Sequence, residues 1–77
     1  MAGARRLDLK GLECPEPAIR VFREFGKLEV GEWVEAEMDS EACAYTAVEL
    51  INRSGLGLAS LAEESPGVFV VRAFRLR

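Results

Sequence analysis

Apolar and polar residues follow two different periods along the chain, and the changes of period mark the predicted elements. In RRLDLKG the leucines fall on one side and the charged residues on the other, which predicts a short strand ended by Gly11. The run VGEWVEAEMD alternates in the same way, with apolar residues at 34, 36 and 38 and glutamates between them. It predicts a second strand with one buried face.

Two other segments carry apolar residues at spacings of three and four. The first, PAIRVFREFGKL, predicts an amphipathic helix that starts at about Pro15–Pro17 and ends near Gly26. Its expected apolar face holds Ala18, Val21, Phe22, Phe25 and Leu28. The second, DSEACAYTAVELINRSG, predicts a helix with Asp39 or Ser40 as N-cap and Gly55 as its stop. Its expected apolar stripe holds Cys43, Ala44, Ala47, Val48 and Ile51.

The segments LGLASLAEE and VFVVRAFRL, separated by SPG, predict a terminal hairpin. The order β-α-β-α-β-β predicts an α/β (α+β) two-layer sandwich with a four-stranded mixed sheet and both helices on one face. Right-handed crossovers make the first two strands parallel, so both strand-to-helix junctions, residues 11–17 and 39–43, are expected at one end. Trp33 and Phe69 are expected on the face away from the helices, where a contiguous patch would form a partner or dimer surface and a solitary exposed aromatic would be ordinary.

Composition narrows the class of protein. The 77 residues predict a single domain over 1–77, and 49% apolar with 30% charged residues is typical of soluble globular domains. The net charge of −3 disfavours direct nucleic-acid binding. The opening MAGARR is not followed by an apolar run, so we expect no signal peptide, no membrane span and a cytoplasmic location.

The chain has two cysteines and no histidine. A Cys/His nucleophile pair and the usual zinc sites therefore lack their parts. A Cys-x-x-Cys redox motif is excluded as well, because Pro17 stands where the second cysteine would be. A thiol that accepts and passes on a sulfur atom needs neither histidine nor a second cysteine. It needs exposure, a fixed geometry and a partner.

Cys14, in GLECPEPAI, is the candidate for that thiol. Pro15 and Pro17 disfavour helical conformation for the residues before them, so Cys14 is expected on an extended step leading into the helix. The helix dipole there favours a thiolate. The alternative is a helix started by proline with an incidental buried cysteine.

Charged residues around Cys14 act in opposite directions. Lys10 and Arg20 favour a thiolate whereas Glu13 and Glu16 oppose it, and the effects nearly cancel. These four residues are candidates for tuning the thiol or for docking a partner. The glutamates would favour a basic partner surface.

The segment LDLKGLECPEP resembles the signature of the TusA/SirA sulfur-carrier family, in which a strand, a Gly-Leu step and a Cys-Pro-x-Pro motif open the first helix. The form Cys14-Pro15-Glu16-Pro17 resembles the TusA branch in particular. The likeness continues through a second strand ending in Asp39 and a final hairpin. Two positions depart from the usual pattern, since Ser40 replaces a proline and Leu56 replaces a histidine.

The resemblance implies a βαβαββ sandwich and a persulfide carrier. In such a protein Cys14 would take sulfane sulfur from a cysteine desulfurase or a rhodanese-like donor. It would hand that sulfur to a relay protein serving tRNA thiolation, cofactor biosynthesis or sulfur oxidation. The resemblance implies no metal and no organic cofactor.

Other interpretations stay open. Cys43 is expected in the first turn of the second helix, at the same end as Cys14, where it would resolve a persulfide, form a disulfide or simply fill the core. Asp39 would orient a partner near Cys14 or cap the neighbouring helix. The whole chain would otherwise be a non-catalytic regulatory module, or a thiol redox protein that uses Cys14 with Cys43.

Overall fold

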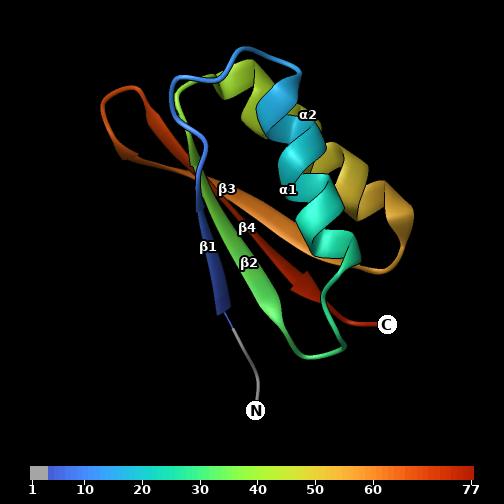
Figure 1. Cartoon of the computed structure of the whole chain (residues 1–77). Coiled ribbons are helices and arrows are strands. Elements are labelled where there is room, and N and C mark those ends of the chain that lie inside the picture. The colour runs from blue at the N-terminus through green and yellow to red at the C-terminus, as the bar shows by residue number, and fades with distance from the viewer. Residues whose placement is uncertain (1–3) are drawn as a thin grey trace.

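The computed structural model describes residues 4–77, which form six elements in the predicted order (Figure 1). The elements are β1 (Ala4–Asp8), α1 (Glu16–Gly26), β2 (Trp33–Met38), α2 (Glu41–Ser54), β3 (Gly57–Ser65) and β4 (Val68–Arg75). Both helices begin and end close to the predicted residues. α1 starts in the Pro-Glu-Pro segment and ends at Gly26, and Gly55 follows α2 in a left-handed conformation.

The sheet has the strand order β1-β2-β4-β3. β1 and β2 are parallel, whereas β4 is antiparallel to both β2 and β3. One row of the inward face runs through Leu7, Ala36, Val71 and Leu61. The predicted mixed four-stranded sheet is therefore confirmed, and the last strand lies between the second and the third.

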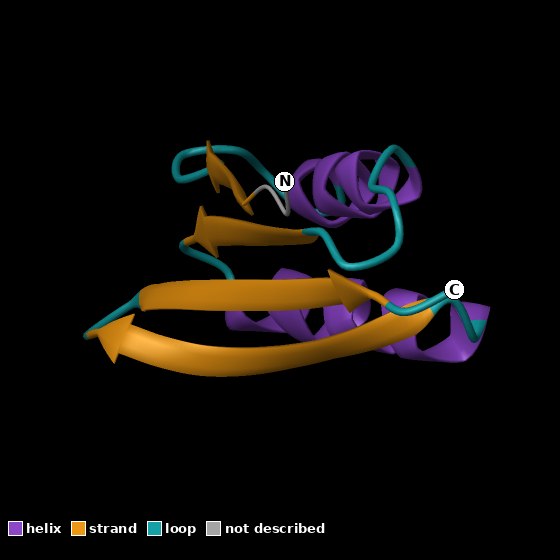
Figure 2. Cartoon of the chain, turned by 90° about the horizontal axis from the view of Figure 1, so that it is seen from below, coloured by secondary structure: helices purple, strands orange, loops and turns teal. Residues whose placement is uncertain are grey.

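Both helices lie against one face of the sheet, with α1 beside β2 and α2 mainly over the β3–β4 hairpin (Figures 1 and 2). The core between the two layers is continuous and contains Phe25, Met38 and Ile51 as its largest side chains. The predicted apolar faces are confirmed except at Phe22, which is 39% exposed. Phe22 lies at the margin of the stripe, where a helix turns its side chains toward solvent.

The two strand-to-helix junctions lie at the same end of the sheet, as the crossover predicts. The tight turn between β3 and β4 lies at this end too, since Phe69 near the start of β4 pairs with Met38 at the end of β2. Gly67 supplies the left-handed conformation of that turn, with φ 78°. β1 begins and β4 ends at the opposite end of the sheet (Figure 1).

The predicted placement of Phe69 on the open face is wrong. Phe69 pairs with the fully buried Met38 and packs against the core. Phe74 takes the outward place instead, where its ring stacks on Trp33 with 5.6 Å between the ring centroids. β4 is apolar at most positions on both of its sides, so alternation alone does not assign its faces.

Candidate functional site

Cys14 is exposed in the connection between β1 and α1, directly before Pro15, the N-cap residue of α1. The Cys14–Pro15 peptide bond is cis. The helical hydrogen bonds begin here, because the Glu16 amide donates to the Glu13 carbonyl at 2.9 Å and the Ile19 amide donates to the Pro15 carbonyl at 3.1 Å. The thiol thus lies at the helix entrance. The predicted extended step is wrong, because Cys14 and Pro15 form a turn and Glu16 is already helical although a proline follows it.

Pro17 anchors the start of α1 in the core. Its ring lies in the first turn of α1 and is fully buried, whereas Cys14, three residues earlier, faces solvent. A proline there removes no helical hydrogen bond, because the first amides of a helix have no intrahelical partner. The motif therefore combines a packed helix start with an exposed sulfur.

Asp39 ties the Cys14 connection to the end of β2. Its Oδ2 atom accepts a hydrogen bond from the Gly11 amide at 2.8 Å, and Gly11 adopts a left-handed conformation with φ 86°. The Leu9 amide adds a second link to the Glu37 carbonyl at 2.8 Å. The prediction that Asp39 caps the neighbouring helix is wrong. Ser40 is the N-cap of α2, and its Oγ accepts from the Cys43 amide at 3.2 Å.

Cys43 lies in the first turn of α2 and is fully buried, as its place in the apolar stripe predicts. Burial is the largest cause that raises the pKa of the Cys43 thiol to about 11, and the neighbouring Cys14 side chain adds to the increase. The backbone at Ala18, in the first turn of α1, lowers the pKa in part.

The four charged candidates are placed differently from one another. Arg20 donates from Nε to Glu16 Oε1 at 3.1 Å, one helical turn apart. The Lys10 ammonium lies 3.6 Å from Glu37 Oε2 and 3.9 Å from Asp8 Oδ1, so its charge is directed to the sheet. Glu13 is exposed. These exposed ion pairs are weak, and docking by this charged rim stays a prediction.

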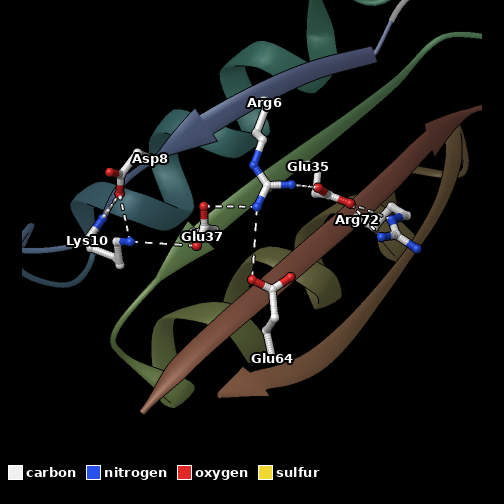
Figure 3. A network of polar contacts seen from close by, with 7 residues as sticks. All are labelled: Arg6, Asp8, Lys10, Glu35, Glu37, Glu64 and Arg72. Carbon is white, nitrogen blue, oxygen red and sulfur yellow. Dashed lines mark hydrogen bonds and ion pairs between the residues drawn. The ribbon is translucent and has the colours of Figure 1, made fainter. Parts of the chain in front are cut away.

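Sequence reasoning missed a charge network on the open face of the sheet (Figure 3). Glu35 is only 7% exposed and accepts hydrogen bonds from Arg6 and from Arg72, whose Nε lies 2.9 Å from Glu35 Oε2. The Arg72 guanidinium also lies over the Trp33 ring, 5.5 Å from its centroid. Alternation along β2 points Glu35 outward, but only the strand order shows that an arginine flanks it on each side.

Within residues 4–77, no three His, Cys, Asp or Glu side chains are grouped so that they could hold a metal ion. Neither helix of this part of the chain has the length and apolar character needed to cross a membrane. The geometry offers one exposed thiol, Cys14, at the entrance of α1, and one buried thiol, Cys43, in the first turn of α2.

Known proteins resemble this chain in sequence and in fold. A family model described as "Sulfurtransferase TusA" matches residues 5–73. Among solved structures, a SirA-like protein from Desulfitobacterium hafniense superposes with a TM-score of 0.83 over 97% of this chain and 100% of its own, at 22% sequence identity. That likeness shows the shared fold. No curated protein matches the chain.

Proposed function

Since the chain belongs to the TusA sulfurtransferase family, we propose that it is a sulfur carrier that holds sulfane sulfur as a persulfide on Cys14. A cysteine desulfurase or a rhodanese-like protein would supply the sulfur, and a relay protein would receive it. The observation that carries the proposal is the exposed Cys14 thiol at the entrance of α1, in the motif Cys14-Pro15-Glu16-Pro17.

The transfer needs only thiol chemistry. The Cys14 thiolate attacks the terminal sulfur of a donor persulfide, a bond from Sγ to that sulfur forms, and the donor thiolate leaves with the electron pair of the broken S–S bond. Unloading repeats the step in the other direction, with an acceptor thiolate as nucleophile. No oxidant, metal or organic cofactor takes part.

Access and rigidity support this function. Cys14 faces solvent, so a partner's thiol can approach it, and the connection that bears it is held by Asp39 on one side and by the buried Pro17 on the other. Because the sulfur is already held in place, less conformational entropy is lost when a partner docks. Glu13 and Glu16 are exposed beside it and favour a partner with a basic surface.

The cellular role follows from the partner rather than from the carrier. We propose action in the cytoplasm, with sulfur passed protein to protein toward tRNA thiolation, cofactor biosynthesis or sulfur oxidation. The carrier itself would not contact nucleic acid, because its net charge is −3.

Intact-mass measurement after incubation with a cysteine desulfurase and cysteine tests the proposal. Wild type should gain one sulfur, about 32 Da, through persulfidation of a thiol. Cys14→Ser should gain none, and Cys43→Ser, the matched control at the other thiol, should still load. Absence of the gain in wild type, or an equal gain in Cys14→Ser, would contradict the assignment.

A further inference from the structure

A groove lies between the edge strand β1 and the flank of α1. β1 is an outer strand of the sheet, whereas α1 packs mainly against β2, β4 and α2 (Figure 1). The inward face of β1 is therefore incompletely covered, since Leu7 is only partly buried although Leu9 is buried. The groove measures about 190 Å³ and is lined by Leu7, Leu9, Arg20, Arg23, Glu24 and Lys27.

The groove is basic, although the chain as a whole is acidic. Glu24 lies 3.0 Å from the Arg5 guanidinium and 3.4 Å from the Lys27 ammonium, so one carboxylate is shared by two cations. Within residues 4–77, Arg23 has no ion-pair partner. Cations outnumber carboxylates here, whereas the chain has 10 Lys and Arg against 13 Asp and Glu. The charged residues that line or border the groove are Arg5, Glu16, Arg20, Arg23, Glu24 and Lys27.

The outer edge of β1 offers backbone hydrogen bonds beside this groove. The Leu9 amide donates to the Glu37 carbonyl of β2 at 2.8 Å. Because the backbone groups of successive residues in a strand point to opposite sides, those of Arg6 and Asp8 are directed to the outer edge. No strand of residues 4–77 lies on that side of β1. An extended chain can add there as a further strand, with alternate side chains entering the groove.

The dimensions favour such a segment over a small molecule. Pockets for small ligands usually measure about 300–1,000 Å³, so a groove of about 190 Å³ accommodates a few side chains rather than an enclosed ligand. The helix rises by about 10.5 Å from Arg20 to Lys27. Side chains at alternate positions of a strand are about 6.7 Å apart, so two neighbouring ones fit within that row of cations.

We propose that the groove between β1 and α1 binds an extended segment of a partner protein that carries acidic residues at alternate positions. The backbone of the segment pairs with the outer edge of β1, and its carboxylates lie against Arg20, Arg23 and Lys27. Cys14 is outside the groove, before the start of α1, so a partner held in this way leaves the thiol accessible. The inference does not depend on the carrier function.

Peptide binding to the full chain tests the charge requirement. The probe is a labelled eight-residue peptide that alternates threonine with glutamate, and its control has glutamine in place of glutamate. In fluorescence anisotropy the glutamate peptide should bind at least about tenfold more tightly, and raising the salt concentration should weaken it. Arg23→Glu should weaken binding about three- to tenfold. Arg53→Glu makes the same charge change on α2 and should bind the peptide as wild type does.

Hydrogen exchange of wild type tests the position of the peptide. At saturation the amides of Arg6 and Asp8 should exchange more slowly, whereas the amide of Leu61 on β3, the other edge strand, should be unchanged. Protection on β3 in place of β1, or no binding of the glutamate peptide, would overturn the inference. So would equal binding of the two peptides. An oligothymidylate of equal charge that binds as tightly without protecting β1 would indicate a general polyanion site and would overturn it too.

Discussion

Asp39→Ala should loosen the connection that bears Cys14. The substitution removes the carboxylate oxygen that accepts the Gly11 amide at 2.8 Å. A hydrogen bond to a charged group contributes roughly 1.5–3 kcal/mol, but both residues are exposed and water replaces part of the interaction, so we expect a loss of about 1 kcal/mol. In a domain of this size that loss lowers Tm by about 4–8 °C.

Two matched variants isolate the hydrogen bond. Asp39→Asn keeps an acceptor oxygen without the charge and should lose roughly half as much stability as Asp39→Ala. Glu41→Gln removes a carboxylate from the first turn of α2 and so reports the helix-dipole contribution alone, about 0.3–1 kcal/mol. Trp33, the single tryptophan, provides the fluorescence signal for thermal or urea unfolding.

Local opening of the connection is measured by hydrogen exchange. The Gly11 amide should exchange faster in Asp39→Ala than in Asp39→Asn, because its acceptor is gone. Loading of Cys14 from a desulfurase should slow in the same order. Unchanged Gly11 exchange in Asp39→Ala, with stability equal to that of Asp39→Asn, would refute the argument that this carboxylate holds the connection.

Three further outcomes follow from other contacts. Ser40→Ala should destabilise the protein by about 1 kcal/mol in urea unfolding, because the N-cap of α2 is lost. Ser40→Thr keeps a hydroxyl acceptor and should retain most of the wild-type stability. Gly57→Ala should be severely destabilising, because its Cβ would lie 1.9 Å from the Phe74 carbonyl oxygen, whereas Gly26→Ala meets nothing within 4 Å and should be neutral or stabilising in thermal unfolding. The folded-state pKa of Cys43, about 11, lies above its ordinary 9.0, so the folded state binds more protons between these values. The free energy of unfolding should therefore fall more steeply between about pH 9 and 11 in wild type than in Cys43→Ala. Parallel plots of that free energy against pH would contradict the raised pKa.

The order and bounds of the elements were predictable because local signals agree with the fold. The Pro-Glu-Pro segment marks the start of α1 and Gly26 its end, and the serine–proline–glycine segment before Val68 forms the tight turn of the hairpin. The burial of Cys43 was predictable for the same reason, since it belongs to a clear apolar stripe on α2. Such features depend on residues within a few positions of one another.

Features that depend on distant strands were not predictable. Asp39 directly precedes Ser40, the N-cap of α2. In the sequence, an aspartate at this place is equally suited to capping the helix and to accepting a hydrogen bond from a loop, and only the folded position of Gly11 decides between the two roles. The network around Glu35 requires β4 to lie beside β2.

The ends of the sheet have a practical consequence for joining this protein to other polypeptides. β1 begins and β4 ends at the end opposite the connection that bears Cys14. An affinity tag, a surface-immobilisation linker or a fused donor domain joined ahead of β1 or after β4 would therefore lead into the sheet at the end away from the thiol. A tether from the last strand that is to deliver a fused donor to Cys14 must span the length of β4, eight residues or about 26 Å, so linker length should control intramolecular loading.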